Sequence, residues 1–375
     1  MRLGILGGGQ LAQMLTQAAV SLGLDTAIYD TAPDSPASRL TQTHTIGAWD
    51  DLDALRAFAA GCDVLTLENE FVFAQPLSDL AATGVQIYPP PATLATIQDK
   101  FRQKQAIQSA GLPVPQFAAV ESPDEVRQFA LTLGYPLVLK IRYGGYDGYG
   151  NATVRTPDDL DATWAKLAKP GRRLMVEQWV GFERELAVMV VRGRDGQTAV
   201  YPVVETVQQH HICHVVRAPA DISAQQADLA SDLARSAVET VGGVGVFGVE
   251  VFAMPDGTVI YNEIAPRPHN SGHYTIEACA TSQFENHIRA VMGWPLGDIK
   301  LRAPAAVMVN IFGKRNGYTD PHAIRPALSV PGATLHIYGK REVRIGRKMG
   351  HVTVLASTLA EAESVARAAA DPVTF

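Results

Sequence analysis

The chain has 375 residues, 47% of them hydrophobic, so it is long enough to form two or three domains with large cores. A net charge of −6 from interspersed charges gives no sequence-wide attraction to nucleic acid or to an anionic membrane. Three cysteines without metal-ligand spacing suit a reducing compartment, and glycines and glutamines near the N-terminus argue against a signal peptide or membrane span. We therefore expect a globular, cytoplasmic protein.

The first segment, residues 1–92, has the pattern of a Rossmann-like, doubly wound α/β domain. Its predicted strands cover 2–6, 26–29, 64–67 and 85–88, and its predicted helices cover 11–22 and 52–60. Gly7, Gly9 and Ala12, with Asp30 at the end of the next strand, satisfy most of the dinucleotide-binding fingerprint. Alternatively, these glycines only allow a tight turn, and Gln10 at the helix N-terminus contacts a phosphorylated substrate.

A central domain, residues 93–300, follows a run of three prolines and has an α+β order, with a lid subdomain at 113–182. The pattern predicts helices at 93–109, 124–133, 157–167, 223–241 and 284–292, and strands at 137–141, 174–178 and 185–191. The last segment, 301–375, is expected to be a small C-terminal domain with strands at 306–311 and 334–338 and a helix at 359–370.

Two carboxylates lie on a predicted hairpin within the central segment. A Pro-Asp-Gly turn at Pro255 separates a strand over 245–252 from a strand over 257–261. The hairpin places Glu250 on one strand and Glu263 at the end of the other, where two hard oxygen ligands can share magnesium ions.

A glycine-rich stretch, 142–151, directly follows the apolar strand that ends at Lys140. A lysine at a fixed point, together with backbone N–H groups exposed by glycines, suits nucleotide phosphates. The alternative is a surface hairpin with an ordinary lysine. The Gly-Lys-Ser/Thr ending of a Walker A motif is absent. Further on, the basic run 340–351 is interrupted by glycines, which favours an anion-binding loop over a solvated face.

Three groups of residues together resemble the ATP-grasp superfamily: Lys140 with the Gly-Gly-Tyr-Asp-Gly loop, the pair Glu250 and Glu263, and the Arg-Pro-His-Asn-Ser-Gly-His run at 267–273. That last run, the start of the chain and the end near His351 resemble the N5-carboxyaminoimidazole ribonucleotide synthetase family over nearly the whole length. The resemblance implies an ATP-grasp fold between an N-terminal pre-ATP-grasp domain and a small C-terminal domain.

The resemblance also implies roles for individual residues. Glu250 and Glu263 would hold Mg²⁺, and Lys140, Arg267, His269 and Tyr146 would be catalytic. The aminoimidazole ribonucleotide and the carboxylate would contact Gln10, Tyr146, Arg267, His269, Asn270, Ser271, Lys340 and Arg347. ATP would contact Lys100, Lys140, Gly145, Tyr146, Asp147, Gly148, Tyr149, Gly150, Asn151, Glu177, Gln178, Trp179, Val180, Glu185, Gln208, Asn262 and Glu263.

Two positions depart from the family pattern. Tyr149 stands where relatives often carry a basic residue, which puts one phosphate contact in doubt. Gln208 stands where relatives commonly carry a histidine, so a nucleotide contact is replaced or lost.

The implied reaction joins bicarbonate to 5-aminoimidazole ribonucleotide with hydrolysis of ATP, through carboxyphosphate, in purine biosynthesis. The resemblance further implies a homodimer and leaves open a transient hand-over of product to the mutase that follows. Neither nucleic acid nor a membrane is expected as a partner. The alternatives are another ATP-grasp ligase that uses formate or an amino acid, a nicotinamide-dependent oxidoreductase, and an inactive nucleotide-binding regulator.

Overall fold

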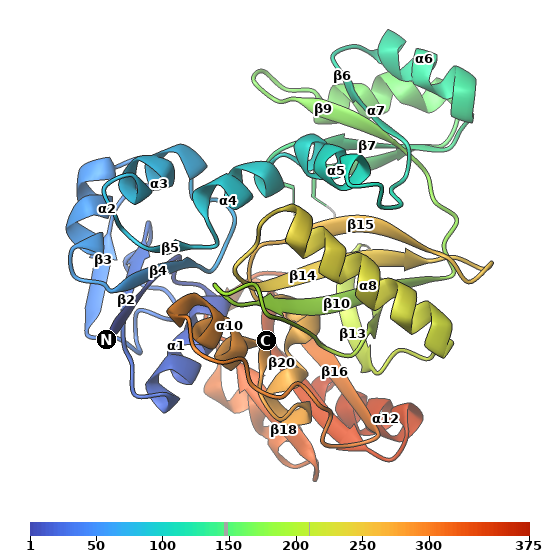
Figure 1. Ribbon diagram of the computed structural model, residues 1–375. Coiled ribbons are helices and arrows are strands. Elements are labelled where there is room, and N and C mark those ends of the chain that lie inside the picture. Colours follow the sequence, from blue (N-terminus) through green and yellow to red (C-terminus); the bar gives the residue numbers. More distant parts are fainter. Residues whose placement is uncertain (146–148, 210) are drawn as a thin grey trace.

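Three main sheets organise the chain, as a computed structural model shows for residues 1–145, 149–209 and 211–375 (Figure 1). The N-terminal sheet is parallel, in the order β3-β2-β1-β4-β5. Its strands are β1 (Arg2–Leu6), β2 (Asp25–Asp30), β3 (Thr43–Ile46), β4 (Val64–Leu67) and β5 (Ile87–Tyr88). Its helices are α1 (Gln10–Ser21), α2 (Leu52–Ala59), α3 (Ala74–Ala81) and α4 (Pro91–Gln98). This confirms the predicted α/β domain, although β3 and α3 were not predicted.

A four-stranded antiparallel sheet in the order β6-β9-β7-β8 stands apart from the other two sheets (Figure 1). It comprises β6 (Phe117–Val120), β7 (Leu137–Ile141), β8 (Asn151–Val154) and β9 (Leu174–Gln178), with α6 (Pro123–Leu133) and α7 (Leu160–Leu167). Lys140 and the start of the glycine-rich loop lie at the end of β7, at the border of this sheet with the rest of the molecule.

The largest sheet has nine strands, eight of them in the order β15-β14-β10-β12-β13-β16-β20-β18, with β11 paired to β10. Their bounds are β10 (Arg184–Arg192), β11 (Thr198–Val200), β12 (Val204–Gln209), β13 (Ile212–Ala218), β14 (Gly245–Ala253), β15 (Val259–Ala265), β16 (Ala305–Phe312), β18 (Ala333–Ile337) and β20 (Lys348–Ala356). The strands after residue 301 therefore extend the central sheet. A short ribbon of β17 (Gly317–Tyr318) and β19 (Glu342–Val343) stands beside it.

Helices cover both faces of the large sheet. Apolar residues of α8 (Ala224–Thr240) pack on β10 and β14, and those of α12 (Leu359–Ala370) pack on β16 and β20. Helix α10 (Gln283–Met292) packs against α1 and so joins the N-terminal and central parts. The remaining helices are α5 (Lys100–Ser109), α9 (Thr275–Ala278) and α11 (Arg325–Leu328), and the 3₁₀ turns are Pro157–Asp159, Asn270–Gly272 and Pro321–Ile324.

The helix predicted over 93–109 is wrong in one respect, because the chain forms two helices there. Asp99 is extended, with φ −98° and ψ 104°, and its side chain accepts a hydrogen bond from the N–H of Phe101. It therefore ends α4 and caps α5. Within the described ranges, no helix combines the length and the apolar character needed to cross a membrane.

Candidate active site

The hairpin of β14 and β15 brings three oxygen-bearing side chains together through a β-bulge. Glu250 pairs with Glu263, but the next pair is Val251 with Tyr261, so Asn262 is an extra residue. Tyr261 and Ile264 are 0% and 1% exposed in the core, which turns both residues between them to the opposite face. The Asn262 amide donates to Glu250 Oε2 at 3.3 Å. Asn262 Oδ1 is buried and has no hydrogen-bond partner among the described residues.

This set of side chains fits a magnesium ion. Two carboxylates and an orphaned amide oxygen are the hard ligands that Mg²⁺ prefers. Burial favours the protonated form of Glu263, but Lys100 and Lys140 outweigh burial and hold its pKa below the ordinary value. Glu263 is therefore ionised at neutral pH, as a metal ligand must be.

Lysines from two elements converge beside the hairpin. Lys100, at the start of α5, forms an ion pair with Glu263. Lys140, at the end of β7, forms an ion pair with Glu177 on the neighbouring strand β9. The Glu177 side chain is 4% exposed and contacts a second lysine, Lys104, at 2.5 Å.

The buried Lys104–Glu177–Lys140 group is held in a charged state. Burial opposes the ionisation of Glu177, yet the two lysines lower its pKa to about 2. Burial would also lower the pKa of Lys140, but the Glu177 carboxylate raises it above the ordinary value. Burial lowers the pKa of Lys104 to about 8. Two cations share one carboxylate, so positive charge remains for an anionic ligand.

Asp99 fixes the glycine-rich loop to the start of α5. Its carboxylate accepts from Arg142 Nε at 2.9 Å and from the Tyr143 hydroxyl at 2.9 Å. The Lys100 N–H donates to the carbonyl of Arg142 at 2.9 Å. The break between α4 and α5 therefore places Lys100 next to the loop that follows Lys140.

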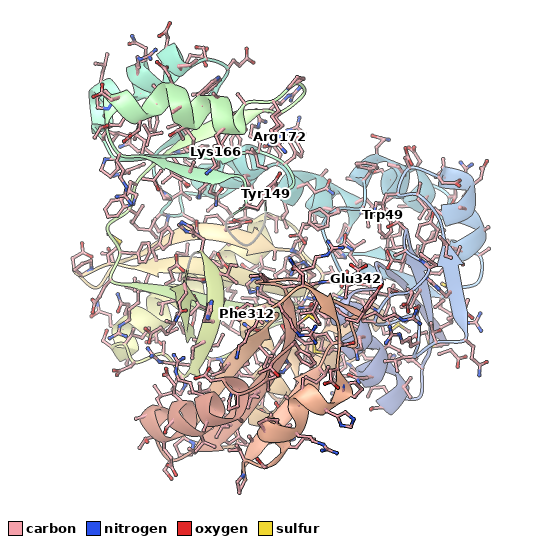
Figure 2. All side chains as sticks on the ribbon, turned by 180° about the vertical axis from the view of Figure 1, so that it is seen from behind. Trp49, Tyr149, Lys166, Arg172, Phe312 and Glu342 are labelled. Atoms are coloured by element: carbon pink, nitrogen blue, oxygen red, sulfur yellow. The ribbon has the colours of Figure 1, made fainter. Side chains whose placement is uncertain are left out.

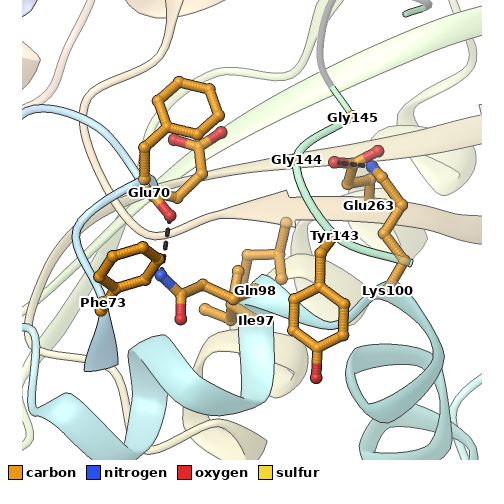
Figure 3. Close-up of a pocket in the computed structure, with 11 residues that line it drawn as sticks. Glu70, Phe73, Ile97, Gln98, Lys100, Tyr143, Gly144, Gly145 and Glu263 are labelled. Atoms are coloured by element: carbon orange, nitrogen blue, oxygen red, sulfur yellow. Dashed lines mark hydrogen bonds and ion pairs between the residues drawn. The ribbon is translucent and has the colours of Figure 1, made fainter. Parts of the chain in front are cut away.

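A pocket of about 310 Å³ opens between this loop, α4 and the N-terminal domain (Figure 3). Glu263 and Lys100 line it on one side, and Glu70, Phe73 and Gln98 line it on the other. Figure 3 shows the Lys100–Glu263 pair at one end and the hydrogen bond from Gln98 to the Glu70 carbonyl at the other. The pocket therefore borders the carboxylates of the hairpin.

Parts of the glycine-rich loop are described. A Cβ on Gly145 would lie 3.0 Å from the Tyr149 carbonyl oxygen and 3.3 Å from Lys100 Cε, so this loop lies tightly on Lys100. Tyr149 accepts a hydrogen bond from Arg172 at 3.1 Å, beside which it lies in Figure 2. Asn151 pairs with Lys140 between β8 and β7. Gly150 has φ +85°. The predicted contacts of Tyr146, Asp147 and Gly148 lie outside the described residues.

The residues predicted to hold adenosine lie around the connection of β9 to β10. Gln178 ends β9, Trp179 is 47% exposed, and Val180 follows before the chain enters β10 with Glu185. Burial raises the pKa of Glu185, while a hydrogen bond from Gln208 partly offsets burial. The two residues lie on neighbouring strands, β10 and β12.

The turn after β15 presents a second group of polar residues. Arg267 donates two hydrogen bonds to Glu70 of the N-terminal domain, at 2.5 and 2.9 Å. His269 Nδ1 lies 2.7 Å from the Ser271 hydroxyl, and His269 Nε2 lies 3.7 Å from Glu250 Oε1. The turn is thus adjacent to the carboxylates of the hairpin.

Gln10 and Lys340 meet although 330 residues separate them. Lys340 Nζ donates to Gln10 Oε1 at 2.5 Å and to the Lys348 carbonyl at 2.7 Å. Two other predicted substrate residues also have partners within the chain. Asn270 is 9% exposed and its amide is paired with that of Asn310, and Arg347 donates to the Glu342 carbonyl at 2.8 Å.

The N-terminal glycine turn is filled by side chains of the chain itself. A Cβ on Gly7 would lie 2.3 Å from Glu68 Cγ, and one on Gly9 would lie 2.7 Å from Glu68 Oε1. Glu68 Oε2 accepts from the N–H of Ala12 at 3.4 Å, in the first turn of α1. A carboxylate thus occupies the place where the pyrophosphate of a dinucleotide would lie.

The sequence prediction missed residues that complete this site. Lys104 is four residues after Lys100 on one helix, so the helical repeat could have placed both on the same face. Glu70 pairs with Arg267 across 197 residues, and no local pattern indicates such a contact.

Comparisons with known proteins agree with this architecture. Residues 1–98 match the ribonucleotide synthetase preATP-grasp domain, 105–284 the ATP-grasp domain, and 306–365 the phosphoribosylaminoimidazole carboxylase C-terminal domain. Fold and site together define an ATP-grasp protein with a preATP-grasp domain.

Full-length relatives narrow the assignment. The N5-carboxyaminoimidazole ribonucleotide synthase of Synechococcus elongatus is 41% identical over 98% of this chain and 92% of its own length. The chain belongs to the N5-carboxyaminoimidazole ribonucleotide synthase family. A solved Aspergillus clavatus N5-carboxyaminoimidazole synthase, in complex with ADP and 5-aminoimidazole ribonucleotide, matches with a TM-score of 0.91 and 40% identity, over 99% of this chain and 98% of that one.

Some relatives are longer. The chain is 40% identical to the chloroplastic phosphoribosylaminoimidazole carboxylase of Vigna aconitifolia, over 96% of its own length but 65% of that protein's length. It therefore spans about two thirds of this relative.

Proposed function

We propose that the chain carboxylates 5-aminoimidazole ribonucleotide with bicarbonate and ATP, giving N5-carboxyaminoimidazole ribonucleotide, ADP and phosphate. The observation that carries the proposal is the bulged hairpin, whose Glu250, Asn262 and Glu263 lie directly before the turn with Arg267 and His269. The names of the full-length relatives and the ADP and ribonucleotide complex of the solved relative support it.

In this proposal, Glu250, Glu263 and Asn262 hold magnesium, which would offset charge on the transferring phosphoryl group. Lys100 and Lys140 bind the ATP phosphates, and Glu177 positions Lys140 and Lys104 because its carboxylate contacts both. The residues around Gln178 to Val180, with Glu185 and Gln208, hold the adenosine. The glycine-rich loop, Gly145 to Asn151, covers the phosphates and excludes water from the labile intermediate.

The chemistry proceeds in two steps. A bicarbonate oxygen attacks the γ-phosphorus, the bond to the β-phosphate oxygen breaks, and ADP leaves carboxyphosphate behind. The ribonucleotide amine then takes the carboxyl group, directly or as released carbon dioxide, and phosphate leaves. His269 accepts the amine proton in this proposal, which is supported by the contact of its Nδ1 with Ser271 and by the position of its Nε2 on the side of Glu250. Gln10, Arg267, Ser271, Lys340 and Arg347 bind the ribonucleotide.

Release of ADP with bicarbonate or formate, with and without 5-aminoimidazole ribonucleotide, tests this proposal. We expect turnover with bicarbonate that is strongly stimulated by the ribonucleotide, and none with formate. Turnover with formate or with an amino acid would favour another ATP-grasp ligase. An oxidoreductase is disfavoured because Glu68 fills the turn that would receive a dinucleotide.

Glu263→Gln should lower bicarbonate-dependent ATP turnover by at least about 100-fold, because a ligand worth several kcal/mol of transition-state charge stabilisation is lost. The unfolding midpoint in urea serves to show that the fold is retained. Glu239→Gln, at an exposed carboxylate on α8, is the matched control. Wild-type turnover in Glu263→Gln would contradict the assignment.

A homodimer, hand-over of product to a mutase and a cytoplasmic location remain predictions. Light scattering on the purified chain measures its mass in solution and so tests the first of them.

A further inference from the structure

The turn that carries His269 has two faces. His269 and Ser271 contact each other, and His269 Nε2 points towards Glu250. Asn270 and His273 instead contact Asn310 and His351 of the C-terminal strands. Four residues that form one motif in the sequence therefore divide into two sets of contacts.

Three polar side chains of the C-terminal strands pack against the side of the turn that faces away from His269. Asn310 of β16 is the cross-strand partner of His351 on β20, and His351 is the partner of His336 on β18. Directly opposed residues of antiparallel strands point to the same face, so these three form one row, which we call the polar ladder. The flanking residues Val309 and Val352 point to the other face, against α12.

Each member of the polar ladder contacts one residue of the turn or of α9. Asn270 and Asn310 exchange two amide hydrogen bonds at 3.0 and 2.7 Å. The rings of His273 and His351 lie 4.9 Å apart. Glu277 Oε1 lies 2.6 Å from His336 Nε2.

The spacing explains this match. Residues 270, 273 and 277 are three and four positions apart, as on one side of a helix, and the 3₁₀ turn and α9 cover that stretch. Three neighbouring strands of the sheet thus meet three residues on one side of the 3₁₀ turn and α9.

The contacts of Asn310 and His336 are polar, which makes their geometry demanding. The contact of His351 with His273 is between the rings, and the Nε2 atom of each is buried without a hydrogen-bond partner among the described residues. An amide or imidazole that loses its partner in the interior costs about 1–3 kcal/mol, so these groups tolerate little displacement. Burial lowers the pKa of both His273 and His351 well below the ordinary value, so both rings are neutral. A purely apolar core would hold the turn less specifically.

The ladder also reaches the other half of the ribonucleotide site. The Tyr338 hydroxyl lies 2.9 Å from His351 Nδ1, and the ring of Tyr338 lies under Lys340, 5.5 Å from Nζ. Lys340 in turn contacts Gln10. His351 therefore connects the turn with His269 to the segment with Lys340.

We propose that Asn310, His351 and His336 are positioning residues that fix His269 relative to Lys340, and so set ribonucleotide affinity and the share of ATP turnover that ends in product. The proposal rests on the proposed function for its kinetic readout. None of the three side chains needs to touch a substrate. Asn270 and His273 are the residues of the turn through which the polar ladder acts on His269.

Asn310→Leu keeps the branched shape of the side chain, removes both amide bonds to Asn270 together with the bond to the Cys213 carbonyl, and is the main test. We expect kcat/KM for the ribonucleotide to fall on the order of 10- to 100-fold, because small misplacement of catalytic groups is costly. The ratio of product to ADP should fall below that of the wild type, while KM for ATP stays unchanged. Thr353→Val is the matched control, because Thr353 is 1% exposed on the same strand as His351 and its hydroxyl has no partner within the described ranges.

Glu277→Ala replaces Asn310→Leu if the latter does not fold, since Glu277 lies at the more exposed end of the ladder, and Glu277→Gln is its conservative counterpart. A ribonucleotide-selective loss in Glu277→Ala that Glu277→Gln restores supports the proposal. Equal losses for ATP and ribonucleotide, or wild-type kinetics, overturn it.

A crystal structure of the variant separates this proposal from the proposed function. Displacement of His269 from Lys340 supports the ladder whatever the reaction is, and an unmoved pair overturns it. Absence of ribonucleotide-dependent turnover in the wild type would instead overturn the proposed function alone.

Discussion

The molecule contains two glycine-rich turns that each follow a buried strand, and they have opposite environments. A Cβ on Gly8, after β1, would lie 2.1 Å from Ser35 Oγ and 2.5 Å from Asp30 Oδ2. For Gly144, after β7, no atom of the described residues lies within 4 Å of such a Cβ. The first turn is packed with the chain's own side chains, and the second faces a pocket. The residues around a glycine turn, and not its spacing, decide whether a phosphate can enter.

The buried carboxylates beside the two turns, Glu68 and Glu177, have pKa values shifted in opposite directions. Burial raises the pKa of Glu68, and the hydrogen bond from Asn69 and the more distant Arg267 only partly offset it. Glu177 is also buried, but Lys104 and Lys140 lower its pKa to about 2. Lysines therefore keep the buried carboxylate ionised beside the open turn, whereas burial dominates beside the filled one.

The largest expected effect is at the open turn. Glu177→Gln removes the carboxylate that pairs with both Lys104 and Lys140 and should lower the free energy of unfolding by about 3–5 kcal/mol at neutral pH. Urea denaturation measures this, with Glu183→Gln at an exposed carboxylate as control. Because the pKa of Glu177 is depressed, its contribution is complete above pH 4.5 and is lost as pH falls towards 2. A loss below 1 kcal/mol at pH 7 would contradict this electrostatic picture.

The glycines themselves give the next test. Gly8→Ala should cost about 1–3 kcal/mol, because the added methyl overlaps Ser35 and Asp30. Gly144→Ala should cost about 1–2 kcal/mol from its positive φ of +73° and should meet no neighbour. Urea denaturation of both variants gives the comparison. If Gly144→Ala proved clearly the more destabilising, the contrast between a packed and an open turn would be wrong.

Glu68→Gln should have the smallest effect, with the opposite sign to Glu177→Gln. Since burial raises the pKa of Glu68, the folded state favours the protonated acid, and its stabilisation is complete below pH 4.5 and lost as pH rises. The variant should therefore unfold at a slightly higher temperature than the wild type at pH 7 and at the same temperature at pH 4. A lower midpoint at pH 7 would show that Glu68 stabilises the turn as a charged group.

Local patterns were sufficient for much of the fold. Apolar strands such as Arg2–Leu6 and Val64–Leu67, and the hairpin with Glu250 and Glu263, were predicted correctly because their periodicity is local. The break at Asp99 was missed although its capping contact, with the N–H of Phe101, is local. The contacts that hold the same carboxylate from the loop after β7, with Arg142 and Tyr143, are distant in sequence and no local pattern indicates them.

The site was harder to predict where side-chain direction matters. One extra residue at Asn262 turns two consecutive side chains to the same face, which strict strand alternation does not allow. The direction of the Asn270 side chain could not be predicted from local sequence, because its partner, Asn310, lies 40 residues away. Glu68 fills the first turn although it is distant from Gly7 and Gly9 in sequence, so the spacing of the glycines gives no sign of it. The roles assigned to individual site residues remain predictions.

The continuous central sheet also determines which fragments of the chain can be expressed separately. A fragment ending at residue 300 would lack β16 and leave β13, with its buried Val215 and Val216, as an exposed edge. Unpaired apolar edges recruit other chains, so such a fragment would aggregate on expression. It would also lose the strands that hold the turn behind His269. The C-terminal segment therefore belongs to the same folding unit as the central sheet, and a fragment meant to fold on its own should include it.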